Sequence, residues 1–309
     1  MKLVSMYSFI AKVLKKLGVN AYIHYYDWLT DRVTTDLDGE YDLALDFYGY
    51  SSFLTALIAN EVNARRKATW LHDEDMYWLK SVERYLGSYD KVVGVSNAVR
   101  DAFIQKYPLH ASQAVTIYNP IDCDVIRAKA EEFMLVEYDG RFNILTVGRL
   151  HSQKGYDVAL ETAKILQEKI LGAFAWYSLG DGGLKEKLEK QRDELGLKNV
   201  FYFLGTRDNP YPYMKHCDLY VQPSRHEGYV ITLVEARCLE STIIASDIPS
   251  NSEQIQNGQN GLIVALDAEK LVNRICEMFH DESKRKKLAE NAAKSVPVFS
   301  AEIAKIEAI

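Results

Sequence analysis

Two glutamates, Glu227 and Glu235, stand eight residues apart in the stretch Ser-Arg-His-Glu-Gly-Tyr-Val-Ile-Thr-Leu-Val-Glu-Ala. The pattern predicts a helix that begins between them, near residue 229, and eight residues of helix rise about 12 Å. At that separation the two carboxylates could grip a ligand as long as a sugar joined to a nucleoside through a diphosphate. Gly228 allows the backbone to approach such a ligand, and the unpaired N–H groups that open a helix favour a phosphate.

The alternative for any two glutamates is an acid at a helix N-terminus and a solvated acid further along the helix. The neighbours of Glu235 argue against this alternative, because they are apolar and a carboxylate without a partner is costly among them. These neighbours are Leu233, Val234, Ala236 and Leu239.

A second candidate phosphate site lies upstream, in residues 142–155. An apolar strand runs into Gly148 and is followed by Arg149 and Lys154, just before a helix with one apolar side. Strand ends of this kind are where open α/β sheets bind ligands. An arginine offers a planar fork to phosphate oxygens and a lysine a mobile point charge, so together they can neutralise a diphosphate. Surface cations in loops are common, so this pair alone leaves a plain surface role open.

The two motifs together resemble the nucleotide-sugar site of family 4 retaining glycosyltransferases of the GT-B fold, of the kind found in bacterial capsule and exopolysaccharide synthesis. The motifs that carry the likeness are Gly148-Arg149, Lys154-Gly155 and the pair Glu227 and Glu235. It continues in residues 179–182, 203–205, 209–213 and 217–224 and covers roughly residues 40–295. One position departs, because Val230 stands where members of that family often carry Gly or Pro.

The resemblance implies transfer of a hexosyl group from a nucleoside diphosphate sugar to a hydroxyl of a saccharide or lipid-linked saccharide, with retention of configuration and without a metal or other cofactor. By the same resemblance, Glu227 holds hydroxyls of the donor sugar near the reacting carbon, and Glu235 holds the ribose. The remaining donor-binding positions are Gly148, Arg149, Lys154, Gly228, Tyr229, Val230 and Ile231.

His72 is the candidate catalytic residue of the first half of the chain, at the expected end of a strand. An imidazole can hydrogen-bond a sugar hydroxyl in either protonation state, and the resembled family places a histidine of its first domain against the donor sugar. A structural histidine is the alternative. Asp73 and Asp75 also raise the possibility of a divalent metal, but the cations and the helix N-terminus already supply positive charge, so we expect no metal and acids that complement a helix dipole.

Composition describes an ordinary folded protein of 309 residues, with 48% hydrophobic and 26% charged residues, a length that predicts two domains. A net charge of -6 argues against a nucleic-acid partner, which usually meets a basic face.

The chain has no apolar run of eighteen residues and no signal-peptide pattern, so we expect a cytoplasmic protein, with possible contact at the inner face of the membrane. Residues 8–18 could form a basic amphipathic helix that touches anionic lipid, or a surface helix facing its own core.

The cysteines are far apart in the sequence and include no C-x-x-C pair, which argues against a zinc site. For a cytosolic chain we expect them to be reduced thiols. They are Cys123, Cys217, Cys238 and Cys276.

Apolar strand-like runs alternate with helical patterns, which predicts an α/β protein with parallel sheets covered by helices on both faces. The expected strands are 41–47, 68–71, 91–95, 114–117, 142–147, 173–179, 199–204, 219–222, 242–246 and 261–264. We expect two Rossmann-like domains facing a cleft. Residues 1–122 form the acceptor-side domain, 123–139 a linker, 140–295 the nucleotide-sugar-binding domain, and 296–309 a helix that returns to the first domain.

The first domain is expected to be incomplete, because only four or five candidate strands precede Asp122 and no glycine precedes Gly18 to form a phosphate-facing loop after a first strand at residues 1–8. A missing piece, either supplied by a partner subunit or absent from this product, would leave a chain that binds its donor better than it transfers it. A divergent but complete domain is the alternative. Two other functions remain open: a non-catalytic subunit that binds sugar nucleotides, and a nucleotide-sugar epimerase of similar fold. No motif supports the lysine-bound pyridoxal cofactor of a phosphorylase.

Overall fold

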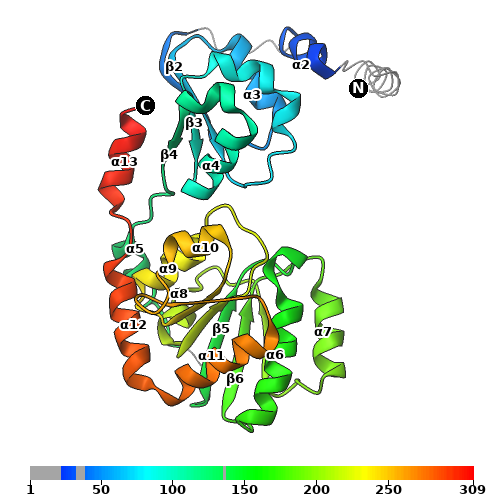
Figure 1. Cartoon of the computed structure of the whole chain (residues 1–309), viewed down its shortest axis with the longest axis vertical. Helices are drawn as coiled ribbons and strands as arrows, with labels where there is room; N and C mark the ends of the chain where they lie inside the picture. The colour runs from blue at the N-terminus through cyan, green and yellow to red at the C-terminus, as the bar shows by residue number, and fades with distance from the viewer. Residues whose placement is uncertain (1–21, 33–38, 135–136) are drawn as a thin grey trace. The chain divides into compact units, whose positions relative to one another are not determined.

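The computed structural model describes residues 22–32, 39–134 and 137–309 (Figure 1). The strand expected at residues 1–8 and the amphipathic helix expected at 8–18 lie outside these residues. The chain divides into two compact units, Met1–Tyr118 with Ala304–Ile309, and Asn119–Ile303. None of the described helices is both long enough and apolar enough to cross a membrane.

The first unit contains a parallel sheet of four strands in the order β1-β2-β3-β4. The strands are β1 (Tyr41–Asp46), β2 (Ala64–Leu71), β3 (Lys91–Gly94) and β4 (Ala114–Thr116). The described helices are α2 (Tyr22–Thr30), α3 (Ser52–Glu61) and α4 (Asn97–Lys106), with short 3₁₀ turns at Leu79–Ser81, Glu83–Ser88 and Pro108–Gln113. The hydroxyl of Ser96 caps α4 by accepting the N–H of Val99.

The second unit contains a parallel sheet of six strands in the order β10-β9-β8-β5-β6-β7. The strands are β5 (Phe142–Val147), β6 (Phe174–Leu179), β7 (Phe201–Gly205), β8 (Leu219–Gln222), β9 (Ile243–Ser246) and β10 (Leu262–Val264). After β7 the chain returns to the centre and lays β8 beside β5. Successive strands therefore run outward in both directions from the β5/β8 pair.

The second unit has nine described helices, and several of them pack an apolar face onto this sheet. They are α5 (Cys123–Lys129), α6 (Tyr156–Lys169), α7 (Lys185–Glu194), α8 (Tyr211–His216), α9 (Ile231–Cys238), α10 (Pro249–Gln254), α11 (Ala268–His280), α12 (Glu282–Lys294) and α13 (Phe299–Glu307), whose last turn is counted with the first unit. α6 and α11 lie against each other in Figure 1. Their buried residues Leu160, Leu166 and Ile275 join Ile144 and Trp176 of the strands in one core, because each helix has an apolar stripe of helical period.

The expected α/β class with two parallel sheets is confirmed, and each of the ten expected strands is present within a few residues. The largest difference is β2, which begins at Ala64 instead of residue 68, because its charged first half pairs with β1 although its side chains are partly exposed. The segment expected as a linker begins with α5, and α5 belongs to the second unit.

The prediction of four reduced cysteines is wrong for one pair. Cys123, the first residue of α5, forms a disulfide with Cys238, the last residue of α9, while Cys217 and Cys276 are free. The two bonded cysteines are 115 residues apart in the sequence. Only the packing of α5 against α9 brings their Cα atoms to 5.2 Å, so no local spacing could have revealed the bond.

Candidate functional site

The two loops that the sequence singled out leave the sheet at neighbouring strand ends. The loop from Gly148 to Gly155 follows β5, and the loop from Pro223 to Val230 follows β8. Because β5 and β8 are parallel neighbours, both loops emerge at the same edge of the sheet. This is the point where the strand order reverses, the usual place for a ligand in an open α/β sheet.

Lys154 and Glu227 meet between these loops. The Nζ atom of Lys154 is 2.6 Å from Oε1 of Glu227, and both side chains are largely buried. The hydroxyl of Ser224 donates to the same carboxylate oxygen at 2.7 Å, and Nε2 of Gln222 is 3.5 Å from it. The motif predicts a phosphate partner for Lys154, and the family resemblance implies a sugar partner for Glu227. Neither predicts that the two side chains pair with each other. The pair compensates a carboxylate that would be costly to bury alone.

A second contact ties the two loops together. The guanidinium of Arg225 makes a bidentate ion pair with Asp157 in the first turn of α6, with N–O distances of 2.8 and 2.7 Å. Arg225 also donates its backbone N–H to the carbonyl of Gln153 at 2.7 Å, and Nε2 of Gln153 donates to the carbonyl of His226 at 2.9 Å. The Arg225 guanidinium holds the pKa of Asp157 below its usual range. Sequence analysis missed Arg225 and Asp157, whose only signal was opposite charge within the two motifs.

Glycines allow the close approach of these loops. Gly155 has a φ of +66°, and a Cβ atom built on it would lie 1.9 Å from the carbonyl oxygen of Pro223. Gly180, which follows β6, would bring a Cβ to 2.1 Å from the carbonyl oxygen of Gly148. A Cβ on Gly148 itself would lie 3.4 Å from the Lys154 side chain, at ordinary contact distance. Glycine is therefore required at 155 and 180 by backbone packing.

The helix that separates the two glutamates is α9, and it begins at Ile231 instead of near residue 229. Val230 precedes it in an extended conformation, so the turn takes two more residues than the pattern predicted. Gly228, Tyr229 and Val230 are buried, whereas Ile231 is exposed. No side chain caps α9 and its first turn holds no acid, so its positive end is suited to an anion.

Glu235 lies in the second turn of α9, half-buried. Burial raises the pKa of its carboxyl above the ordinary value, and a hydrogen bond from the Tyr211 hydroxyl at 3.0 Å offsets part of this rise. Tyr211 opens α8 and belongs to a motif that carried the family resemblance, but sequence analysis gave it no role. It supplies the partner that Glu235 needed among apolar neighbours.

Arg149 follows Gly148 after β5 and is exposed. Its guanidinium has no hydrogen bond or ion pair with any described residue. Arg149 therefore offers an uncompensated positive charge, unlike Lys154.

His72 belongs to the first unit and follows β2 directly. Its Nε2 is 2.7 Å from the carbonyl oxygen of Phe47. Because a carbonyl only accepts hydrogen bonds, Nε2 carries the hydrogen and Nδ1 is the ring nitrogen that remains for a ligand. The nearby Asp73 accepts the backbone N–H of Asp75 at 3.0 Å. The described residues contain no group of three or more His, Cys, Asp or Glu that could hold a metal ion.

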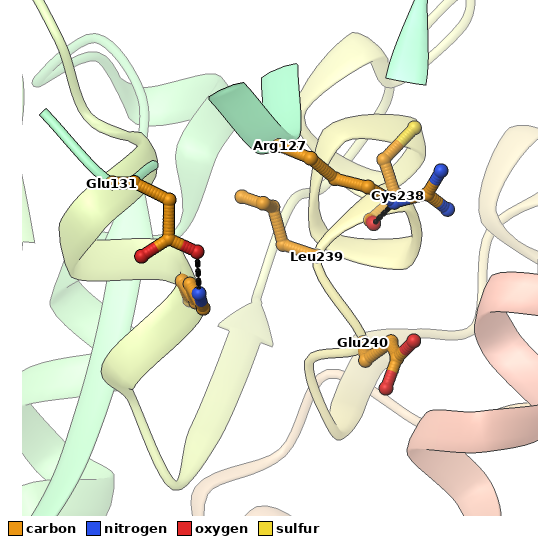
Figure 2. Close-up of a pocket in the computed structure, with 6 residues that line it drawn as sticks. Arg127, Glu131, Cys238, Leu239 and Glu240 are labelled. Atoms are coloured by element: carbon orange, nitrogen blue, oxygen red, sulfur yellow. Dashed lines mark hydrogen bonds and ion pairs between the residues drawn. The ribbon is translucent and has the colours of Figure 1, made fainter. Parts of the chain in front are cut away.

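A cavity of about 450 Å³ lies elsewhere in the second unit, at the C-terminal end of α9, and contains none of the expected site residues (Figure 2). Lys215 there is ion-paired with Glu131, and Nε of Arg127 donates to the carbonyl of Cys238 at 3.1 Å. These cationic side chains already have partners, so this cavity is a weaker ligand site than the loops after β5 and β8.

Comparison with known families identifies relatives of this chain. The family described as "Glycosyl transferases group 1" matches residues 128–295. An uncharacterized glycosyltransferase of Methanocaldococcus jannaschii, MJ1178, is 29% identical over 79% of this chain and 67% of its own length. The lipopolysaccharide core biosynthesis glycosyltransferase LpsE of Rhizobium meliloti is 27% identical over 48% of this chain, a match that spans only 42% of LpsE.

Solved structures resemble the chain over nearly all of its length. The Anabaena protein Alr3699/HepE, crystallised in complex with UDP, superimposes with a TM-score of 0.75 at 19% identity, covering 94% of this chain and 82% of that one. A glycosyltransferase from Rickettsia africae gives a TM-score of 0.74 at 19% identity and covers 93% of this chain and 80% of that one. At these identities the likeness concerns the fold.

Proposed function

Because the chain belongs to the glycosyl transferases group 1 family and has the GT-B fold, we propose that it transfers a hexosyl group from a nucleoside diphosphate sugar to an acceptor hydroxyl, with retention of configuration and without a metal. The observation that carries this proposal is the meeting of Lys154 and Glu227 at 2.6 Å, where the β5 and β8 loops converge.

In the proposed complex, the diphosphate contacts Arg149, Lys154 and the N-terminus of α9. Glu227 accepts hydrogen bonds from hydroxyls of the donor sugar, and Glu235 accepts them from the ribose. Lys154 is already in contact with Glu227. A phosphate that binds Lys154 would therefore free the carboxylate oxygens of Glu227 to bind the sugar. The two halves of the donor would then be recognised together. His72 of the first unit is proposed to offer Nδ1 to a hydroxyl of the same sugar.

The proposed reaction breaks the bond between the anomeric carbon and the phosphate oxygen, and forms a bond from the acceptor oxygen to the same face of that carbon. Positive charge grows on the sugar ring and negative charge on the leaving diphosphate. Arg149, Lys154 and the end of α9 supply positive charge to that leaving group, which is the main catalytic device of such a site. The departing phosphate oxygen accepts the proton of the acceptor hydroxyl.

The named relatives support a role in cell-surface polysaccharide or glycoconjugate synthesis. LpsE acts in lipopolysaccharide core biosynthesis, and a relative from Campylobacter jejuni is an N-acetylgalactosaminyltransferase that acts on an undecaprenol-linked diphosphosugar. We propose a saccharide or lipid-linked saccharide as acceptor, and a cytoplasmic location with contact to the inner face of the membrane.

Calorimetric titration with UDP-, GDP- and ADP-sugars, with and without EDTA, tests donor binding. Arg149→Ala should weaken binding by about 1.5–3 kcal/mol, the scale of a charge-assisted hydrogen bond. Lys190→Ala, an exposed lysine of α7, is the matched control and should bind like the wild type. Equal affinity in Arg149→Ala, or loss of binding in EDTA, would refute the proposed donor site.

Steady-state kinetics test the roles of the glutamates. Glu227→Ala should lower kcat, because Glu227 is assigned to the reacting sugar, whereas Glu235→Ala should mainly raise the donor KM. NMR of the product gives its anomeric configuration. Donor binding without release of nucleoside diphosphate would instead favour a non-catalytic subunit, and interconversion of the donor sugar an epimerase.

A further inference from the structure

A cavity of about 210 Å³ lies in the second unit, where the first turn of α6 meets α7. These two helices lie side by side (Figure 1). We call it the α6/α7 cavity. Among the described residues that line it, none is a proposed donor-binding residue. Pockets for drug-sized ligands enclose about 300–1,000 Å³, so this cavity suits a molecule smaller than a nucleoside diphosphate sugar.

The walls of the α6/α7 cavity are held together by backbone contacts. Leu150, in the loop after β5, donates its N–H to the carbonyl of Asp181 at 3.0 Å, and its own carbonyl accepts the N–H of Leu184 at 3.1 Å. A Cβ atom built on Gly182 would lie 2.6 Å from the carbonyl oxygen of Leu150, so the loops after β5 and β6 are in close contact. The cavity is therefore formed before a ligand binds, which lowers the entropy cost of binding.

Polar side chains of the lining offer hydrogen-bond donors that no described residue uses. Nδ1 of His151 accepts the backbone N–H of Gln153 at 3.3 Å, so Nε2 carries the ring hydrogen and can donate it. Lys187 of α7 is exposed, and its ammonium has no hydrogen bond or ion pair with any described residue. The hydroxyl of Ser152 and the side-chain amide of Gln191 also lack a partner among the described residues. The lining thus provides an ammonium, an imidazole, a hydroxyl and an amide.

The charge of the α6/α7 cavity favours an anion. Asp157 is the one acid among the described residues of the lining, and Arg225 pairs with it through two hydrogen bonds. Glu161, one turn further along α6, also attracts the Arg225 guanidinium, but it is not among the described lining residues. The positive charge of Lys187 is therefore left uncompensated within the lining.

The number of donors distinguishes between anions. A terminal phosphate group has three strongly accepting oxygens, enough to accept hydrogen bonds from Lys187, His151 and Ser152 together. A carboxylate has only two oxygens. We propose that the α6/α7 cavity binds a phosphate group, either free phosphate or the phosphate of a small phosphomonoester, at a site separate from the donor site. This proposal does not depend on the proposed function.

The test is calorimetric titration of the 309-residue chain in a phosphate-free buffer, with inorganic phosphate and ribose 5-phosphate as probes. Lys187→Ala should raise the dissociation constant of the probes by about tenfold or more, as expected for loss of one charge-assisted hydrogen bond. Gln191→Ala should raise it by about threefold, the effect of a neutral hydrogen bond. Lys190→Ala is the matched control, because Lys190 lies on the same helix but pairs with Glu194, and it should bind the probes like the wild type.

The two probes also distinguish the sources of the phosphate group. Tighter binding of ribose 5-phosphate identifies a phosphomonoester as the ligand, and tighter binding of inorganic phosphate identifies free phosphate. Equal probe affinity in Lys187→Ala and Lys190→Ala overturns the inference. Acetate that binds as tightly as phosphate, or no binding of either probe at millimolar concentration, overturns it as well.

Titration of the same variants with UDP-glucose and GDP-mannose separates this site from the donor site. Lys187→Ala should keep the donor affinity while it loses affinity for the probes, and Arg149→Ala should do the reverse. Probe binding that is lost in Arg149→Ala and kept in Lys187→Ala would place phosphate at the donor site alone and overturn the inference. Probe binding that depends on Lys187 in a chain that binds no sugar nucleotide would refute the proposed function and keep the second site.

Discussion

The ion pair between Lys154 and Glu227 contributes both to the stability of the fold and to the proposed binding of the donor. Their ion pair is largely buried, and Ser224 adds a hydrogen bond to the same carboxylate. A buried pair of this kind contributes modestly as a whole, but removing one partner leaves an uncompensated charge. The pair holds the Glu227 side chain in a defined place before any ligand arrives.

Lys154→Ala should therefore destabilise the protein by about 3 kcal/mol, because the Glu227 carboxylate stays buried without its partner. Adding Glu227→Gln to the same chain should restore most of that loss. Denaturant unfolding measures both. The control is Lys164→Ala, which breaks an exposed pair with Glu168 on α6 and should cost no more than about 0.5 kcal/mol. Equal losses in Lys154→Ala and Lys164→Ala would contradict the role given to burial.

For Glu235, we expect the ionised side chain to lower the stability of the fold while it contributes to donor binding. Its pKa is raised by burial, so its ionisation costs folding free energy as the pH rises through that raised pKa. Below about pH 4.3, where a glutamate is protonated folded or unfolded, Glu235→Gln should melt like the wild type. At neutral pH the variant should melt at a higher temperature and yet bind its donor more weakly. Thermal melts across this pH range check the sign, and a difference independent of pH would disprove it.

At the scale of elements, the site depends on β8 lying beside β5. This pairing brings two loops that are far apart in the sequence to one edge of the sheet. Gly155 then brings the first loop to within backbone contact of Pro223 in the second. The ion pair of Arg225 with Asp157 attaches the second loop to the first turn of α6. These contacts hold the loops after β5 and β8 together.

Gly155→Ala should disrupt the packing between the loops after β5 and β8. The new Cβ would lie 1.9 Å from the Pro223 carbonyl oxygen in a backbone with φ of +66°, so the loops must separate, at a cost of about 4 kcal/mol or more. The control is Gly172→Ala, which has a φ of +65° and open space around it, and should cost only the backbone strain of about 1–2 kcal/mol. Donor titration should show weaker binding in Gly155→Ala alone. Equal stability and affinity in both variants would exclude the proposed close packing.

At the scale of the whole molecule, the disulfide between Cys123 and Cys238 lies entirely in the second unit, which spans Asn119–Ile303. It joins the first residue of α5 to the last residue of α9, the helix whose N-terminus is proposed to bind the diphosphate. The bond thus attaches the start of the second unit to the C-terminal end of α9.

Removal of this bond should destabilise the second unit by about 2–4 kcal/mol, because the bond closes a long loop in the unfolded chain. Thermal melts with and without dithiothreitol measure the effect. The double variant Cys123→Ser with Cys238→Ser should melt like the reduced wild type and should not respond to dithiothreitol, whereas Cys276→Ser should still respond. A wild-type melting temperature that ignores the reductant would count against the bond.

The ten strands, their alternation with helices, and the two motifs that contain Lys154 and Glu227 can be predicted from the sequence. Apolar periodicity and glycine positions can be recognised within a short stretch of sequence, because the side chains that a strand or helix buries recur at a fixed spacing. The helix begins at Ile231 instead of near residue 229, because Val230 is extended. The apolar pattern does not predict the backbone conformation of the turn before a helix.

Which side chains contact one another could not be predicted from the sequence, because it depends on how the chain packs in three dimensions. The contacts of Lys154 with Glu227, Asp157 with Arg225, Tyr211 with Glu235, and Cys123 with Cys238 join residues between 24 and 115 positions apart. Each depends on the return of the chain from β7 to the centre of the sheet, or on the packing of helices above it. The free energy that selects such an arrangement is summed over the whole core, so no short stretch of sequence contains it.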